Sequence, residues 1–185
     1  GYLIFELGWA FLTLGIMMGG YWSYETFGWG GYWAWDPVET AELMVWLAAT
    51  LYPHVNVVSR VLRNFILYLI PSTVFLAMYV TRTGLSPLHS FANPNIGMLL
   101  LLVSSLIFLA LAFYNISKAE ISRRSIIAPL RDKEPYRLGM YLTTTAFILA
   151  FLFVFGSLLV PAVMASTGMD VSVPQMAGGI RYFHP

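Results

Sequence analysis

The sequence predicts an all-α integral membrane protein with about five transmembrane helices, and three observations carry that prediction. The 185 residues are 58% hydrophobic and only 10% charged, whereas soluble domains contain about 25% charged residues. Several long stretches carry no charge at all, and a helix needs about 20 apolar residues to cross the hydrocarbon core. Short segments of alternating polarity, the pattern of a membrane barrel, are absent from the sequence. The composition therefore excludes an ordinary soluble domain and a disordered chain.

Composition also excludes several classes of function. The chain contains no cysteine, so it has no disulfide framework, no thiolate metal site and no catalytic thiol of its own. Its formal net charge of +1 is too small to attract a polyanion, so we expect no nucleic-acid partner. The expected surroundings are membrane lipid and other membrane proteins.

The predicted helices follow one another within a single membrane domain, residues 1–185. We place the spans at about 2–22, 38–58, 64–81, 95–116 and 138–161. The connections are an aromatic segment at 27–40, a loop at 82–94 that contains a histidine, and a basic loop at 117–137. The first span begins directly after Gly1, which reads as though upstream sequence were missing.

The basic residues predict how the chain is oriented. Eight of the ten Lys and Arg residues flank the predicted connections after the second and fourth spans, and only Arg82 and Arg181 lie on the other side. Basic residues stay on the cytoplasmic side of membranes. We therefore expect the N-terminus inside and the C-terminus outside. A bacterial or archaeal plasma membrane, or a mitochondrial inner membrane, is the expected location.

Aromatic residues accumulate on the predicted outer side, in a run that contains paired glycines. The run reads Trp29-Gly30-Gly31-Tyr32-Trp33-Ala34-Trp35-Asp36. One interpretation is an interfacial belt that anchors the protein at the lipid headgroups. The other is a platform for a large, flat, apolar ligand, with glycines that let the backbone approach it closely. The residues alone leave these two interpretations about equally supported.

The carboxylates that follow this run have a local explanation. Asp36 before Pro37, with Glu39 three residues after it, is typical of a helix start in which Asp is the N-cap and Glu reaches back. That role accounts for Asp36 and Glu39 without chemistry, although a site role for Asp36 stays open. The sequence does not decide the role of Glu42.

His54 lies within the second predicted span, toward its inner end. An ionisable residue inside a span is a functional hypothesis by default, and the alternative is a neutral imidazole bonded to a neighbouring helix. Pro53 frees a backbone carbonyl and kinks the helix beside it. Without cysteine or a nearby carboxylate, zinc is poorly supported. Haem held by histidine in apolar surroundings fits better.

The other histidines are His89, in the outer loop, and His184, near the end of the chain. Two histidines on one iron have nitrogens about 4 Å apart, since each metal–nitrogen bond is about 2 Å. His54 and His89 are predicted on opposite sides of a core about 30 Å thick, so they cannot share an iron. If both bind haem there are two haems, and a partner chain is needed to supply the missing axial ligands. We treat His184 as incidental.

Taken together, these features resemble the haem-handling family of cytochrome c biogenesis to which CcmF and CcsA belong. The matching elements are the tryptophan-rich run at 29–39, known as the WWD signature, Trp46 followed eight residues later by His54, the segment at 82–94 around His89, the basic stretch at 121–124, and Arg181-Tyr182-Phe183. The later segments look more like CcmF, while Tyr32-Trp33 and Glu39-Thr40 are more similar to CcsA.

The resemblance implies roles for individual residues. His54 would be an axial ligand of a haem b held within the membrane. His89 would be one of two outer histidines on a second, transient haem. Trp29, Gly30, Gly31, Trp33, Trp35 and Asp36 would form the platform for that outer haem. No catalytic residue is assigned.

The resemblance also implies the activity and the partners. The chain looks like the middle portion or a split subunit of CcmF, a haem-handling part of a cytochrome c haem lyase that is inactive alone. Its partners would be other membrane chains carrying the missing axial histidines, a haem donor of the maturation pathway, and apocytochrome c, whose thiols receive the haem. Two alternatives are an electron-transfer b-type cytochrome subunit and a structural membrane subunit without a cofactor.

Overall fold

The computed structural model describes residues 2–27, 31–84, 96–118 and 135–167, and its regular elements there are all helical. They are α1 (Tyr2–Phe27), α2 (Pro37–Val58), α3 (Arg60–Val80), α4 (Ile96–Ser117) and α6 (Pro135–Ser166). The predicted all-α fold with five helices is confirmed. The structure gives no membrane orientation, so the predicted inside and outside faces stay predictions.

Helix ends differ from the predicted bounds where capping residues act. α3 begins at Arg60, earlier than predicted, because the Ser59 hydroxyl accepts a hydrogen bond from the Leu62 amide at 3.4 Å. A serine in this position satisfies an amide that the helix leaves unbonded. α6 begins at Pro135, and proline is favoured in the first turn since its missing N–H is not needed there. The short α2–α3 connection thus consists of Ser59 alone.

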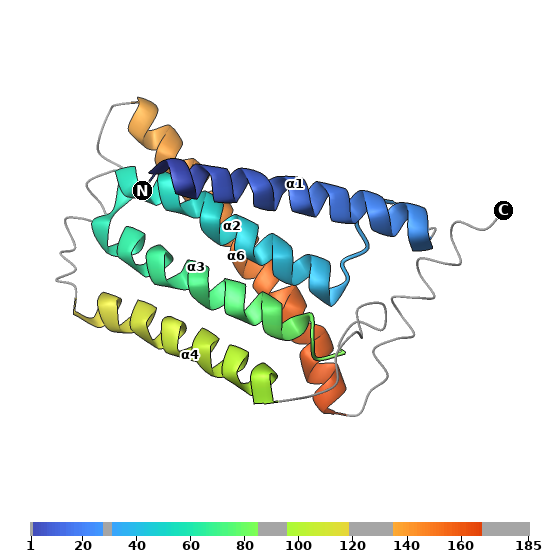
Figure 1. Cartoon of the computed structure of the whole chain (residues 1–185). Helices are drawn as coiled ribbons and strands as arrows, with labels where there is room; N and C mark the ends of the chain where they lie inside the picture. The colour runs from blue at the N-terminus through green and yellow to red at the C-terminus, as the bar shows by residue number, and fades with distance from the viewer. Residues whose placement is uncertain (1, 28–30, 85–95, 119–134, 168–185) are drawn as a thin grey trace.

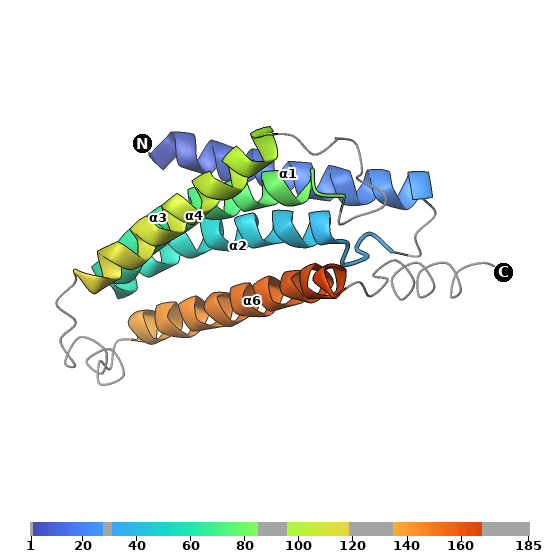
Figure 2. The same cartoon turned by 90° about the horizontal axis from the view of Figure 1, so that it is seen from below.

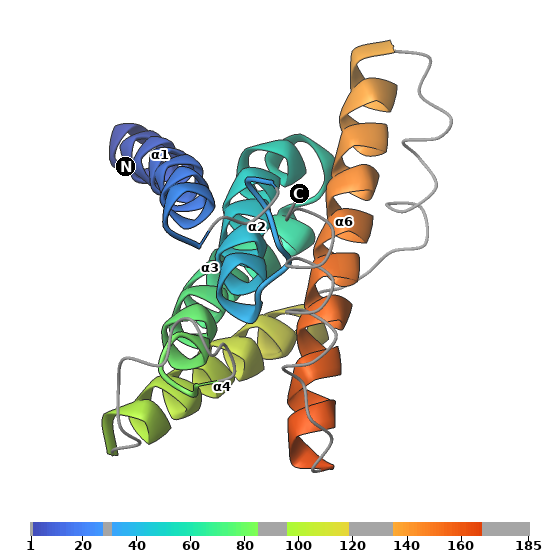
Figure 3. The ribbon, with the colours of Figure 1, turned by 90° about the vertical axis from the view of Figure 1, so that its right-hand side faces the viewer.

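Helix α2 occupies the centre of the bundle. It packs against α1, α3 and α6, and α4 packs on the far side of α3. Figure 3 shows α1 on one side of α2 and α6 on the other, with α3 and α4 following below. A residue on α2 can therefore contact three helices, whereas α1 and α4 each have a broad face that no described helix covers.

The chain reverses direction from one helix to the next along most of the bundle. The N-terminus, the α2–α3 connection, the end of α4 and the start of α6 lie at one end of the molecule (Figure 1). The ends of α1 and α3 and the start of α2 lie at the other, as the view from below also shows (Figure 2). Arg60, Arg63 and Lys118 therefore lie near the same end. This arrangement agrees with the predicted grouping of basic residues.

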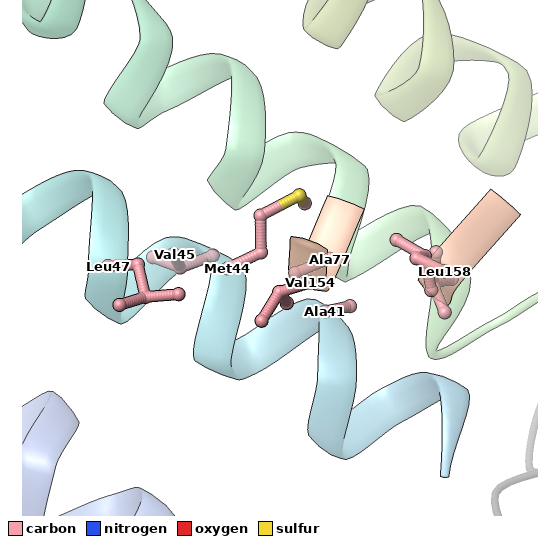
Figure 4. Packing of buried hydrophobic residues seen from close by; sticks show 8 residues of the cluster. Ala41, Met44, Val45, Leu47, Ala77, Val154 and Leu158 are labelled. Atoms are coloured by element: carbon pink, nitrogen blue, oxygen red, sulfur yellow. The ribbon is translucent and has the colours of Figure 1, made fainter. Parts of the chain in front are cut away.

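The largest buried cluster joins α2 to α3 and α6. Met44 and Ala41 of α2 are fully buried, and they pack with Ala77 of α3 and with Val154 and Leu158 of α6. Figure 4 shows Met44 extending from α2 toward α3 while Val154 and Leu158 approach from α6. A second cluster continues the core along α2 and α3 and consists of Leu51, Val55, Ile66 and Leu69. Both clusters depend on α2.

Four helices are long and apolar enough to cross a membrane: α1, α3, α4 and α6. α2 has the length, at 22 residues, but polar residues at both ends and along its middle lower its hydropathy. Neighbouring helices, rather than lipid, surround most of α2, so it need not be apolar on every side. The protein is an integral membrane protein, as the sequence predicts.

Candidate functional site

The aromatic segment is held against the end of α1 by ring stacking and a close backbone contact. Tyr32 stacks on Tyr24, with ring centroids 5.0 Å apart, and on Tyr21 at 6.5 Å. A Cβ at Gly20 would lie 2.8 Å from the Tyr32 carbonyl oxygen, too close for a side chain. Gly20 therefore allows the segment to approach α1.

Trp33 and Trp35 are the tryptophans of the segment that the structure describes. Their rings meet edge to face at 6.0 Å, and Trp35 meets Phe153 of α6 in the same way at 6.0 Å. Trp35 has φ 57°, a left-handed conformation that is unusual for a bulky residue and costs about 1–3 kcal/mol. The Trp33 indole Nε1 is buried and has no hydrogen-bond partner in the described ranges. A strained tryptophan and an unused donor are features of ligand sites more than of a passive belt.

Asp36 caps α2 as predicted. Its Oδ2 accepts a hydrogen bond from the Val38 amide at 2.9 Å, and Pro37 is the first residue of the helix. Glu39 also bonds backwards, but its Oε2 accepts from the Ala34 amide at 2.9 Å rather than from the amide of Asp36. Glu39 therefore ties the aromatic segment to the start of α2. The cap explains the burial of Asp36, which is 6% exposed.

His54 lies on α2 between two partners. Its Nδ1 is 2.8 Å from the Thr50 carbonyl oxygen, and its ring packs on Phe147 of α6 with centroids 5.2 Å apart. A carbonyl has no proton to donate, so this hydrogen bond requires a proton on Nδ1 and leaves the Nε2 lone pair available. Nε2 has no hydrogen-bond partner among the described residues. Among the described residues, the hydrogen bond of His54 is within α2 rather than to a neighbouring helix.

Four side chains join α1 to α2 next to His54, and Trp46 is the one among them that the sequence interpretation singled out. The Trp9 indole donates to the Thr50 hydroxyl at 2.9 Å, and the Trp46 indole donates to the Thr13 hydroxyl at 2.9 Å. Each threonine donates in turn to the carbonyl of the tryptophan four residues before it. We call this set the Trp–Thr clamp. The repeated spacing Trp-x-x-x-Thr in both helices was the signal that could have revealed it.

Trp46, Thr50 and His54 recur every four residues, so they lie along one stripe of α2. The Trp46 ring packs on Trp9 of α1 at 6.0 Å and on Phe147 of α6 at 6.5 Å. The stripe therefore faces the region between α1 and α6. Phe147 packs on the imidazole and Trp46 packs on Phe147, and these rings favour an apolar, ring-shaped ligand.

The residues present fit haem better than a bare metal ion. The described part of the chain contains no group of three or more His, Asp or Glu side chains arranged to hold a metal ion. Haem iron needs only one or two axial ligands, because the porphyrin supplies the others. A histidine whose Nδ1 donates to a backbone carbonyl is the usual form of a metal-ligating histidine. His54 has that form.

The two candidate regions lie toward opposite ends of α2. His54 follows Asp36 by 18 residues, which corresponds to about 27 Å of helical rise. The predicted platform and the predicted membrane ligand are therefore separate sites. Trp29, Gly30, His89 and His184 lie outside the described residues, so their predicted roles stay predictions.

The fold and these side chains define a class: a helical membrane protein with a partly buried histidine on its central helix and an aromatic segment at one end. The model of the family described as Cytochrome C assembly protein matches residues 2–89. CycK of Bradyrhizobium diazoefficiens, a cytochrome c-type biogenesis protein, is 34% identical over 91% of this chain and 27% of its own length. The chain belongs to the cytochrome c-type biogenesis family.

Other relatives agree with that assignment. CcmF of Haemophilus influenzae is 33% identical over 78% of this chain and 24% of its own length. A CcmF N-terminal-like mitochondrial protein of Arabidopsis thaliana is 42% identical over 47% of this chain and 44% of its own length. The chain thus spans about a quarter of the length of these bacterial relatives. No solved structure matches.

Proposed function

We propose that this chain is a haem-handling subunit of a cytochrome c haem lyase. In this role it holds one haem b within the membrane through His54 and helps to present a second haem, the substrate, at the outer face. The observation that carries the proposal is the state of His54, with Nδ1 donating to Thr50 and Nε2 free of hydrogen bonds in the described structure.

The surroundings of His54 support haem as its ligand. Phe147 packs on the imidazole, and Trp46 packs on Phe147, so a planar apolar macrocycle would meet rings rather than charges. The chemistry that haem supplies there is that of a redox-active iron. This chain would contribute the His54 imidazole as a ligand, its tautomer set by the Thr50 carbonyl, and the apolar ring of Phe147.

The aromatic segment supports the second part of the proposal. Trp33 brings a buried indole N–H that has no partner in the described ranges, and Trp35 is held in a strained conformation at the end of the bundle. Gly31 has open space beside it. These features favour a platform that receives the substrate haem, with His89 as a ligand of its iron.

The number of available ligands implies partner chains. In the described residues, His54 has no second histidine near it, and six-coordinate haem iron takes two axial ligands. We propose that another membrane chain supplies the second ligand, that a haem donor loads the outer site, and that apocytochrome c supplies the thiols. The haem vinyl groups and these thiols form the thioether bonds, so this chain needs no cysteine.

The test is the haem content of the purified complex, measured as a pyridine haemochrome, in a His54→Ala variant. We expect loss of the b-type haem with normal assembly of the chains. His184→Ala, on a histidine outside both proposed sites, is the matched control and keeps the wild-type content. Unchanged haem stoichiometry in His54→Ala would refute the assignment.

A second variant separates the two proposed haems. His89→Ala is expected to abolish cytochrome c maturation in cells while the purified complex retains its inner haem. Normal maturation in that variant would contradict the outer role of His89. A complex that contains no haem in the wild type would instead favour the structural alternative.

A further inference from the structure

The Trp–Thr clamp of Trp9, Thr13, Trp46 and Thr50 is the polar contact between α1 and α2 that lies next to His54. We propose that this clamp is the positioning element of the membrane haem site: α1, through Trp9 and Thr50, holds His54 in the tautomer that presents Nε2. This inference rests on the proposed role of His54. It adds α1, which contributes no ligand, to the machinery of the site.

The clamp matters for α1 because most of this helix is exposed in the described structure. Only 6% of the most apolar window of α1 is buried, and lipid gives two helices no hydrophobic reason to associate. Packing and interhelical hydrogen bonds must then supply the attraction. Two part-buried indole–hydroxyl bonds of 2.9 Å are suited to that role.

Each threonine hydroxyl in the clamp both accepts a hydrogen bond and donates one. Thr50 Oγ1 accepts from Trp9 at 2.9 Å and donates to the Trp46 carbonyl at 2.7 Å. Such a chain of bonds strengthens each member and fixes the threonine rotamer. Thr50 is also buried, with 8% of its surface exposed. The backbone around Thr50 is therefore held from both sides, by its own helix and by α1.

Two contacts connect this fixed arrangement of Thr50 and Trp46 to His54. The Thr50 carbonyl accepts the proton of His54 Nδ1 at 2.8 Å, so the residue held by α1 is the residue that sets the tautomer. The Phe147 ring rests on both Trp46 and His54, so displacement of Trp46 reaches the imidazole by a second route. Trp9, Thr13, Trp46 and Thr50 are positioning residues, because they act on iron only through His54.

The first test needs no haem. Nitrogen NMR of ¹⁵N-histidine-labelled full-length chain in lipid nanodiscs reports the protonation of each imidazole nitrogen, and His54→Gln identifies the signals of His54. We expect the Nδ1–H form to dominate in the wild type. In Thr50→Val and in Trp9→Phe, the share of the other tautomer should rise by roughly threefold, the effect of one average membrane hydrogen bond.

Two controls separate positioning from general loosening. Thr50→Ser keeps the hydroxyl and should restore the wild-type tautomer ratio. Ser105→Ala removes a hydrogen bond of the same kind between α3 and α4, away from His54, and should leave the ratio unchanged. If Thr50→Val and Trp9→Phe leave the ratio at the wild-type value, or if Ser105→Ala changes it equally, the proposal is wrong. If the Thr50→Val chain does not fold, Trp9→Phe breaks the same hydrogen bond, keeps an aromatic ring and provides the test.

The second test uses the haem-loaded complex. Trp9→Phe and Thr50→Val should keep wild-type haem stoichiometry but shift the reduction potential and the visible spectrum, because both depend on the axial imidazole. Both variants break the same bond, so the double variant should shift the potential no further than Thr50→Val alone. A wild-type potential in both variants would overturn the inference. If His54→Ala retains its haem, the proposed function fails, while the NMR result still decides whether the clamp positions His54.

Discussion

Helices α2 and α4 have the same length, 22 residues each, but opposite surroundings. α4 is the most apolar of the candidate spans, with a mean hydropathy of 2.7 in a window that is only 11% buried. α2 does not qualify as a candidate span by composition, yet it contributes half of the buried residues of each core cluster. Hydropathy therefore reports which helix faces lipid, not which helix forms the core.

The difference also explains where chemistry is located. A helix that lipid surrounds must be apolar, because each exposed polar group in hydrocarbon is costly. Most of α2 is surrounded by protein, so it can carry Thr50 and His54 and find partners for them. In this molecule the least apolar helix is consequently the one with the candidate haem ligand.

The largest effect should come from removing core volume on α2. Leu51 is 1% exposed and packs in the second cluster, so Leu51→Ala should lower the free energy of unfolding by about 2–5 kcal/mol. Leu100 of α4 is 60% exposed, and Leu100→Ala should change the free energy of unfolding by less than about 0.5 kcal/mol. Unfolding by denaturing detergent in mixed micelles measures both. Equal losses in the two variants would contradict the contrast between the helices.

A smaller effect should appear within α1, where one glycine is packed and its neighbour is open. Gly20→Ala would force a Cβ against the Tyr32 carbonyl oxygen, and such overpacking costs about 1–3 kcal/mol. A Cβ added at Gly19 would meet no atom within 4 Å, so Gly19→Ala should stabilise the helix slightly. Thermal unfolding compares the pair. Identical melting temperatures would show that the aromatic segment does not rest on α1.

The next largest effect on stability is expected at the N-terminal cap of α2. Asp36→Ala removes the acceptor for the Val38 amide and should cost about 0.5–2 kcal/mol, whereas Asn caps as well as Asp. Asp36→Asn should therefore retain wild-type stability. Cytochrome c maturation in the Asp36→Asn strain then decides between the two interpretations of this residue. Lost maturation at normal stability would favour a role in the site beyond the cap.

The smallest effect should come from α4. Ser72 and Ser105 each donate to the carbonyl of the other at 2.9 Å, so Ser105→Ala should cost about 0.6 kcal/mol, an average membrane hydrogen bond. Among the described residues, Ser117 bonds within its own helix, to the Tyr114 carbonyl, and Ser117→Ala should be neutral. Detergent-induced unfolding of both variants is the measurement. A loss as large as that of Leu51→Ala would mean that α4 is not the peripheral helix.

Much of the fold can be predicted from local features of the sequence. The neutral stretches predict five helices because a backbone in lipid must satisfy its own hydrogen bonds. Asp36 and Pro37 predict the start of α2 through local capping chemistry, and the structure confirms it. The target of Glu39 was missed, since the distance from Glu39 to Ala34 depends on how the aromatic segment turns.

The candidate site was predictable only in part. His54 is identifiable as an ionisable residue within a span, but its bond to Thr50 depends on its rotamer. The Trp–Thr clamp needs α1 and α2 antiparallel and in one register. The spacing of residues within either helix alone does not indicate which other helix it packs against.

The sequence by itself determined that this chain is helical, lies in a membrane, and belongs with cytochrome c biogenesis proteins, because those properties depend on composition and on short motifs. Only the tertiary structure decided that α2 is the central helix and that Trp9 of α1 reaches the residue that holds His54. The physical reason is that lipid is as apolar as the helices. Shape and a few interhelical hydrogen bonds, rather than hydrophobicity, then determine which helices meet.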